Sequence, residues 1–380
     1  MSFATDVYHE NQRRLGIGAE REEAPRASLA ARFETSVVTS GLRQRILGQE
    51  HAIEAVDRCL RIVQSRLQDP ERPLVSFLLV GPTGVGKTEL VRRLAAEIRS
   101  GPDDFCRVDM GALAQEHYSA SFAGAPPGYA GSKEGYSVFD RGSIEGDPYT
   151  PGIVLFDEVE KAHPVVLRAL LQILDRGILR LSNGQQTINF RNSLIFLTSN
   201  LGSREIAERH VREPNMRLPL RTKARLRPHR PARHHDGPKS QEQLVTGAVQ
   251  KFFDPEFLNR IDEVVLFREI DIGAARAIAD LELRLLAARL AREEVDINVA
   301  PSVPQLICDL GFNSLYGARS LRRTLQRHVL PPLADALVLA KNNGARSVNI
   351  ALDVRDQQVV AEVLQPAPSA EAVTFRRPST

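Results

Sequence analysis

The chain has 380 residues, of which 42% are hydrophobic and none is tryptophan, and its formal net charge is +3. Its length allows two or three packed units. No apolar run approaches the roughly 20 residues needed to span a bilayer, and the first residues lack a signal-peptide core, so we expect a soluble protein of the cytoplasm. The three cysteines are far apart and lack C-x-x-C spacing, which argues against a disulfide framework and against a zinc site.

The N-terminal residues 1–38 are polar and carry charge clusters, which predicts a flexible tail or arm. From residue 39 to residue 267, helical patterns alternate with short apolar runs. Helices are predicted at 50–68 and 87–99, and strands at 75–80, 105–110, 153–156 and 193–197. This alternation indicates an α/β fold with a parallel sheet between two layers of helices.

The pattern changes after residue 267, and residues 268–365 predict a small, mostly helical domain. Helices are expected at 273–294, 305–310 and 317–328, and short strands at 347–354 and 358–363. The remaining residues, 366–380, contain proline and serine and are expected to be disordered.

The positive charge is concentrated in residues 209–239, which hold ten Lys or Arg against two acidic residues. The net charge of this segment is therefore +8, and because the whole chain has a net charge of +3, the remaining residues have a net charge of −5. It also contains five prolines and few large apolar residues, which predicts an exposed, flexible basic insertion. The basic character therefore belongs to this insertion and not to the folded body.

A phosphate-binding loop follows the predicted strand at 75–80. Its eight residues are Gly81, Pro82, Thr83, Gly84, Val85, Gly86, Lys87 and Thr88. The glycines allow backbone N–H groups to point at phosphate oxygens, Lys87 can reach the β- and γ-phosphates, and the Thr88 hydroxyl can bind Mg²⁺. A glycine turn that only joins a strand to a helix is the alternative, and the match at all eight positions argues against it. We therefore expect ATP and Mg²⁺ as cofactors.

Two carboxylates end the next apolar strand, at Asp157 and Glu158. We expect Asp157 to bind Mg²⁺ and Glu158 to orient and deprotonate the attacking water. The alternative is a pair of acids that cap the following helix.

Three further polar residues have no assignable role from the residues alone. Asn200 ends another apolar strand and could touch the γ-phosphate, although an ordinary turn residue is the simpler interpretation. Arg260 and Arg319 could each be a surface ion pair of little consequence.

Seven sequence strings, in this order, resemble the second ATPase module of Clp-type AAA+ chaperones, the ClpA, ClpB and ClpC group. The resemblance covers about residues 42–365. The strings occupy 81–88, 124–131 (GAPPGYAG), 154–164 (VLFDEVEKAHP), 190–192 (FRN), 198–203 (TSNLGS), 255–263 (PEFLNRIDE) and 316–319 (YGAR). It implies a P-loop AAA+ large domain followed by a small domain.

The resemblance also implies roles for individual residues. Arg260 is similar to the arginine finger that reaches a neighbouring subunit's nucleotide, Arg319 to the sensor-2 residue and Asn200 to sensor 1. Ile46 and Leu47 match the stretch that covers adenine. A finger that acts on a neighbour requires a closed ring, and relatives of this module form hexamers, so we expect a homo-hexamer.

Tyr129 matches the aromatic pore-loop residue that grips a polypeptide in the central channel of the ring. A flat amphipathic ring on a glycine-flanked loop can contact any polypeptide, which suits a general substrate. Ala130 replaces the usual valine beside it, and Ser121 stands where an arginine is usual. From this sequence we expect one ATPase module without a globular N-terminal domain, and therefore an adaptor that recruits substrates.

The basic insertion at 209–239 lies where protease-docking relatives carry a hydrophobic-Gly-hydrophobic tripeptide. The insertion contains no such tripeptide, so we expect no docking on a peptidase ring. The leading hypothesis is an ATP-driven unfoldase that threads polypeptide. The alternatives are a nucleic-acid-associated ATPase that uses the basic insertion, and a regulatory switch that does not thread.

Overall fold

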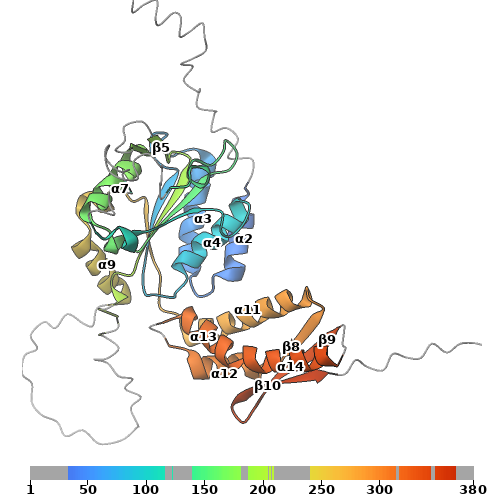
Figure 1. Ribbon diagram of the computed structural model, residues 1–380. Helices are drawn as coiled ribbons and strands as arrows, with labels where there is room; N and C mark the ends of the chain where they lie inside the picture. Colours follow the sequence, from blue (N-terminus) through green and yellow to red (C-terminus); the bar gives the residue numbers. More distant parts are fainter. Residues whose placement is uncertain are drawn as a thin grey trace, which may run out of the picture.

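The computed structural model describes residues 33–115, 122, 139–180, 187–203, 205, 206, 208, 240–313, 316–343 and 347–364. Two bodies are visible in Figure 1, a large α/β domain and a smaller domain of helices with a short sheet. The predicted fold class is confirmed.

A five-stranded parallel sheet forms the centre of the large domain, in the order β2-β3-β6-β1-β7. Every strand pair in it is parallel, and β1 lies between β6 and β7. The strands are β1 (Val75–Val80), β2 (Cys106–Asp109), β3 (Gly152–Asp157), β6 (Ser193–Ser199) and β7 (Glu263–Leu266).

Strand β1 shows why the strands are apolar along their whole length. Side chains alternate between the two faces of a strand. Phe77 and Leu79 belong to one buried cluster, whereas Leu78 and Val80 belong to another. Both faces of the sheet are therefore covered, which is the condition under which a parallel sheet is stable.

Helices α2 (Thr35–Arg45), α3 (Glu50–Ser65) and α4 (Lys87–Ile98) supply buried side chains to the first cluster. Helices α7 (Pro164–Arg176), α9 (Gln241–Phe252) and α10 (Pro255–Leu258) supply the second. Figure 1 shows the two groups of helices on opposite sides of the sheet.

The large domain begins earlier than residue 39. Helix α2 starts at Thr35, and its buried residues Thr35, Val38, Thr39 and Leu42 follow helical spacing. Phe33 and Val38 are 6% and 1% exposed, so residues 33–38 pack against the domain and are no part of a free tail. Residues 1–32 lie outside the described part of the chain.

The small domain places helices against a three-stranded sheet in the order β10-β9-β8. Strands β8 and β9 are parallel, whereas β9 and β10 form an antiparallel pair. Its elements are α11 (Ile272–Ala291), β8 (Val295–Val299), α12 (Ser302–Gly311), α13 (Ala318–His328), α14 (Leu330–Asn342), β9 (Val348–Arg355) and β10 (Gln358–Leu364). Helix α14 accommodates prolines in its first turn, where the missing N–H would have no intrahelical partner.

Smaller elements complete the large domain. They are the 3₁₀ turns η2 (Met110–Leu113) and η3 (Val159–Lys161), helix α6 (Arg141–Glu145), and the hairpin of β4 (Ile178–Arg180) and β5 (Thr187–Asn189). The two 3₁₀ turns come after β2 and β3, and helix α6 lies beside the amino ends of β3 and β6.

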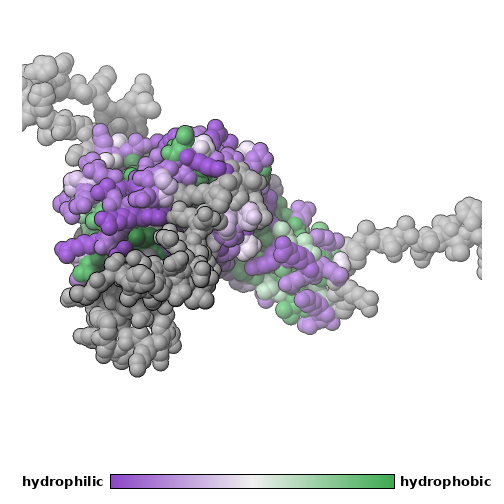
Figure 2. All heavy atoms as spheres, turned by 90° about the horizontal axis from the view of Figure 1, so that it is seen from above, coloured by the Kyte–Doolittle hydropathy of each residue, from purple (hydrophilic) through white to green (hydrophobic). Residues whose placement is uncertain are grey.

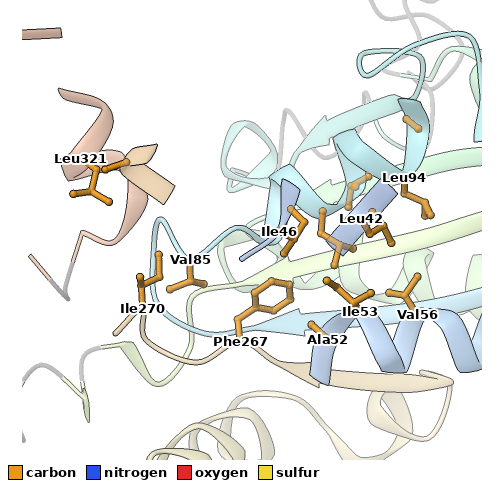
Figure 3. Close-up of a cluster of buried hydrophobic side chains, with 14 of the residues drawn as sticks. Leu42, Ile46, Ala52, Ile53, Val56, Val85, Leu94, Phe267, Ile270 and Leu321 are labelled. Carbon is orange, nitrogen blue, oxygen red and sulfur yellow. The ribbon is translucent and has the colours of Figure 1, made fainter. Parts of the chain in front are cut away.

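Buried hydrophobic side chains continue from the sheet to the small domain (Figure 3). Phe267 and Ile270 lie in the segment that joins the two domains, next to Val85 of the phosphate-binding loop. Leu321 on α13 belongs to the same cluster. The joint between the domains is thus packed and lies beside the phosphate-binding loop.

Hydrophilic residues cover most of the large domain on the face shown in Figure 2. On the small domain hydrophobic residues are mixed with them, and Val338 and Leu339 of α14 are 57% and 63% exposed. Within the described part of the chain, no helix is long and apolar enough to cross a membrane.

Candidate nucleotide-binding site

The phosphate-binding loop lies between the end of β1 and the start of α4. Gly81, Gly84 and Gly86 have φ values of +150°, +80° and +109°, in the region that favours glycine. They turn the chain so that the first N–H groups of α4, which lack intrahelical acceptors, face the cleft. This arrangement is suited to binding an anion at the helix N-terminus.

Lys87 is buried at the base of the loop, with 7% exposure. Its ammonium group donates to the carbonyl oxygens of Gly81 and Pro82 at 2.6 and 2.8 Å, and to Oδ1 of Asn200 at 2.9 Å. Burial lowers the pKa of Lys87 from its ordinary 10.5 to about 8, although the charges of Glu160 and Asp157 oppose this shift. A phosphate group at this point would favour the charged ammonium.

Asp157 ends strand β3 beside Thr198 of the neighbouring strand β6. The Thr198 hydroxyl donates to Oδ1 of Asp157 at 2.5 Å, and Arg107 of strand β2 donates to Oδ2 at 2.5 Å. The strand order β2-β3-β6 brings these three residues together. The Asp157 carboxylate is therefore fixed on both sides, with only 12% of its side chain exposed.

Glu158 follows with a left-handed backbone, at φ +60° and ψ +52°. Its N–H donates to the Thr198 hydroxyl at 3.0 Å, and its carboxylate accepts from Lys161 at 2.5 Å and from Nδ2 of Asn200 at 3.1 Å. A non-glycine residue in this conformation is uncommon and is often found at functional sites. The turn points the carboxylate away from the strand and toward Asn200.

Asn200 connects the two halves of the site. Its side chain accepts from Lys87 and donates to Glu158, while its N–H donates to Oε1 of Glu160 at 3.1 Å. The Thr83 hydroxyl lies 3.4 Å from Oδ1 of the same amide. Asn200 thus contacts both the phosphate-binding lysine and the second carboxylate.

The small domain reaches the phosphate-binding loop at the start of α13. The N–H of Ala318 donates to the carbonyl oxygen of Gly84 at 2.9 Å. A Cβ on Gly84 would lie 2.3 Å from the Tyr316 oxygen, and one on Gly317 would lie 2.6 Å from the Gly84 oxygen. This close approach places Arg319 near enough to Lys87 to lower the pKa of the lysine further.

These residues line a single cleft of about 540 Å³ between the two domains. One wall is apolar and is formed by Ile46 and Leu47 together with side chains of α11 and the joint. These side chains are Ile270, Ile278, Leu281 and Leu285. A flat base of a nucleotide fits such a wall, whereas its phosphates fit the loop at the other end.

Gln49 fixes the segment that carries this apolar wall. Its side chain is fully buried and makes two hydrogen bonds to the backbone of Arg268. Nε2 of Gln49 donates to the Arg268 carbonyl oxygen at 2.8 Å, and Oε1 of Gln49 accepts from the Arg268 N–H at 3.1 Å. Because Arg268 follows β7, this pair holds the segment against the joint between the domains.

The cleft also contains the oxygen ligands that a magnesium ion needs. The Asp157 carboxylate and the Thr88 hydroxyl both line it. Magnesium in nucleotide sites is held by one or two carboxylates and the phosphates, so a larger protein cage is not required. Accordingly, the described residues include no group of three or more His, Cys, Asp or Glu arranged to hold a metal.

Arg260 lies elsewhere. It is about 40% exposed, pairs with Asp175 at 3.1 Å, and lines a separate pocket of about 390 Å³. Its carbonyl oxygen accepts from Ser76, at the start of β1, whereas the phosphate-binding loop follows Val80 at the other end. Because a strand rises about 3.3 Å per residue, these two ends of β1 lie about 13 Å apart.

The structure therefore brings most of the predicted residues into one place. Ile46, Leu47, Thr83, Gly84, Val85, Gly86, Lys87, Thr88, Asp157, Glu158, Asn200 and Arg319 line the cleft. Gly81 and Pro82 contact Lys87, Arg260 lies apart, and Tyr129 lies outside the described residues, as does the basic insertion at 209–239.

Four residues of the site were not predicted from the sequence. Arg107 and Gln49 lie outside the strings that carry the resemblance, whereas Glu160 and Thr198 lie within the strings at 154–164 and 198–203 but were given no role. Thr198 and Glu160 stand within two residues of predicted ones, and polar side chains next to a strand end are the signal that could have identified them.

The comparisons with known proteins agree with this geometry. Residues 72–264 match the family of the AAA domain (Cdc48 subfamily), and residues 271–350 match the C-terminal, D2-small domain of ClpB protein. The first match begins after α3 and extends into β7, the last strand of the sheet, and the second covers most of the small domain.

Curated relatives include an ATP-dependent protease ATP-binding subunit-like protein of Rhodococcus erythropolis, which is 52% identical over 89% of this chain and 92% of its own length. A Pseudomonas aeruginosa protein of the same description, AmiB, is 44% identical over 81% and 80%. The chaperone protein ClpB of Vibrio cholerae is 40% identical over 79% of this chain, which spans only 32% of that relative.

A solved structure of Hsp104, a closed-state cryo-EM reconstruction with ATPγS and FITC casein, is 28% identical and superposes with a TM-score of 0.69. The similarity covers 93% of this chain and 54% of that one. With the ClpB-type small domain next to the AAA domain, these matches confirm the predicted resemblance. The chain belongs to the Clp-type AAA+ ATPases, the family of ClpB and Hsp104.

Proposed function

We propose that the chain is an ATP-driven protein-remodelling enzyme that works as a closed ring of identical subunits. In this proposal Lys87 binds the β- and γ-phosphates, and Ile46 and Leu47 cover the base. Thr88 and Asp157 hold Mg²⁺, which offsets the negative charge of the phosphates when bound.

Glu158 is the general base for the attacking water in this proposal. It can take the proton once its carboxylate is released from Lys161, which now binds it at 2.5 Å. Asn200 lies between Glu158 and Lys87, where its amide can orient the water at the γ-phosphate.

The position of Arg260 is the observation that carries the ring. The cleft is lined by Lys87, five carboxylates and six arginines that include Arg319, but Arg260 lines a different pocket near the opposite end of β1. A guanidinium at that place cannot serve its own subunit's nucleotide without a large rearrangement. A head-to-tail ring gives every cleft the Arg260 of its neighbour.

Polypeptide is the proposed substrate. The solved Hsp104 reconstruction contains casein, and 93% of this chain shares the fold of that Hsp104 chain. Tyr129 is the residue that we propose to grip the polypeptide in the channel, with substrates delivered by an adaptor. We propose no docking on a peptidase ring, although two relatives are described as protease ATP-binding subunit-like. A pull-down showing a stable ATP-dependent complex with the peptidase would contradict this point.

The experiment that tests the function is ATP-dependent unfolding of a tagged fluorescent protein by the wild type and by Tyr129→Ala. Both proteins should hydrolyse ATP at similar rates, and only the wild type should unfold the substrate. If both proteins unfold it equally, Tyr129 does not grip the polypeptide. If neither does, with a candidate adaptor present, a regulatory or nucleic-acid-associated ATPase becomes the better account.

A further inference from the structure

The main chain of Arg260 is held by side chains from a different part of the domain. Nη2 of Arg72 donates to the Arg260 carbonyl oxygen at 2.8 Å, and the Ser76 hydroxyl lies 3.2 Å from the same oxygen. The Arg72 guanidinium is the main donor to this oxygen, because the single proton of the Ser76 hydroxyl is shared with Oδ2 of Asp262, which lies closer at 2.7 Å. Arg260 itself is exposed, but its backbone is anchored.

Arg72 binds three groups with one guanidinium. Besides the Arg260 oxygen, its Nε donates to the carbonyl oxygen of Leu174 at 3.2 Å, and Nη1 lies 3.4 Å from Oδ1 of Asp262. Leu174 precedes Asp175, whose carboxylate pairs with the Arg260 side chain. Arg72 therefore connects the backbone of Arg260 to the end of α7 that holds its side chain.

Ser76 and Asp262 lock the same loop onto the sheet. Oδ2 of Asp262 accepts from the Ser76 N–H at 2.8 Å and from the Ser76 hydroxyl at 2.7 Å. In return, the Asp262 N–H lies 3.1 Å from both the carbonyl and the hydroxyl oxygen of Ser76. Ser76 is 1% exposed and 35% of the Asp262 side chain is exposed, so these hydrogen bonds are shielded from water on the serine side.

We infer that Arg72 and Ser76 are positioning residues that hold Arg260 in place to complete the nucleotide site of the neighbouring subunit. This inference rests on the proposed ring. The planar guanidinium of Arg72 fixes three acceptors in one geometry, which a lysine cannot do. A displacement of a catalytic group by about 1 Å can cost up to 10²-fold in rate, so loss of this anchor affects the neighbour's hydrolysis.

The test uses the full chain and the variants Arg72→Ala, Arg72→Lys and Ser76→Ala. We expect Arg72→Ala to lower kcat for ATP at least tenfold while the Kd for a fluorescent ATP analogue changes less than twofold. Arg72→Lys keeps the positive charge but loses the planar set of guanidinium donors, so its kcat should lie between those of the wild type and Arg72→Ala. Ser76→Ala removes one hydroxyl and provides the same test if Arg72→Ala does not fold.

Arg58→Ala is the matched control. Arg58 pairs with Glu263 at 2.8 Å, directly after Asp262, but it is 59% exposed and makes no hydrogen bond to the Arg260 backbone. Its loss should leave both kcat and Kd unchanged. A tenfold fall in kcat for this control as well would overturn the inference, because any disturbance near Asp262 would then suffice.

Mixed rings show on which subunit the anchor acts. Glu158→Gln subunits are expected to bind ATP without hydrolysing it, yet they keep an intact Arg260. Mixed one to one with Arg72→Ala subunits, they should restore roughly a quarter of the wild-type rate. The Arg72→Ala subunits are half of the chains and keep Glu158, and in a random mixture half of them have a Glu158→Gln neighbour with an anchored Arg260. No recovery means that Arg72 supports its own subunit, which overturns the inference.

A parallel mixture of Arg260→Ala with Glu158→Gln separates this inference from the proposed ring. Recovery in that mixture without recovery for Arg72→Ala contradicts only the role of Arg72. If Arg260→Ala alone hydrolyses ATP at the wild-type rate, both the finger and its anchor are wrong.

Discussion

The two ends of the central sheet carry opposite kinds of polar site. At the carboxyl ends of β1, β3 and β6, Lys87 and Asp157 are buried, and each is held by a neighbour: Lys87 donates to Asn200, and Asp157 accepts from Thr198. Near the opposite end of β1, Arg260 is about 40% exposed and pairs with Asp175 at the surface. A buried set of charges is suited to enclosing a ligand, whereas an exposed and anchored arginine is suited to meeting another molecule.

In the proposed ring, each chain supplies two parts of a catalytic site, the cleft for its own nucleotide and Arg260 for that of a neighbour. The cleft is complete for nucleotide binding, since it has an apolar wall, a phosphate-binding loop and two carboxylates. In the proposed ring, Arg260 lies outside the cleft of its own chain and offsets charge in the transition state at the nucleotide of a neighbour. Substitutions at one end of the sheet should therefore have different effects from substitutions at the other.

The largest expected effect is at Glu158. Glu158→Gln removes the proposed base but keeps the shape of the side chain, so kcat should fall by at least about 10²-fold. The Kd for ATP should change little, because the phosphate contacts remain. Steady-state hydrolysis and binding of a fluorescent analogue measure the two quantities. Glu362→Gln, in the exposed pair with Arg355, is the matched control; a normal kcat in Glu158→Gln would remove Glu158 from the mechanism.

Gly84→Ala should disturb the contact between the cleft and the small domain. The new Cβ would lie 2.3 Å from the Tyr316 oxygen at a φ of +80°, so we expect a loss of about 1–3 kcal/mol in the free energy of unfolding. Chemical denaturation with fluorescence detection measures it. Gly247→Ala, with open space and a helical backbone, should instead gain about 0.5–1 kcal/mol. Equal effects of the two changes would contradict the close approach.

The pKa of Lys87 predicts proton uptake on nucleotide binding. Free Lys87 has a pKa of about 8, and bound phosphate raises it, so affinity should fall as pH increases above 8, by at most tenfold per unit. At pH 8.5 binding should take up as much as roughly three-quarters of a proton, and at pH 7 roughly a tenth. Calorimetry in buffers of different ionisation enthalpy counts these protons. Equal uptake at the two pH values would contradict a lowered pKa.

The smallest effect is expected at the surface pair. Asp175→Asn removes the carboxylate that binds Arg260, but both side chains are about 40% exposed. The free energy of unfolding should therefore change by less than about 1 kcal/mol, as for other exposed pairs. The Kd for ATP should also stay the same. A marked change in Kd would show that the two ends of the sheet are not separate sites.

Much of the fold could be predicted from the sequence. The strand Val75–Val80 was predicted at its observed bounds, because a fully apolar run before a glycine loop has few other structures open to it. Helix α2 was missed since it buries only one narrow stripe, and β7 because it is short and partly exposed. Helix α14 was missed as well, and its first turn contains two prolines.

The site was predictable wherever its residues form a linear motif. The loop at 81–88 and the pair Asp157 and Glu158 were identified in this way, although their roles remain predictions. Arg107 and Thr198 were not identified, because their contacts with Asp157 depend on the strand order β2-β3-β6. The order of strands in a sheet is a property of the whole domain and leaves little trace in a local sequence pattern.

Specific ATPase activity as a function of protein concentration tests the central claim most directly. If Arg260 completes the site of a neighbour, the rate per chain should fall toward that of Arg260→Ala when light scattering shows that the ring has dissociated. Nucleotide binding, measured on the same samples, should persist in the dissociated chains. A rate per chain that stays constant down to the monomer would contradict the account, because each chain would then hydrolyse ATP with its own residues alone.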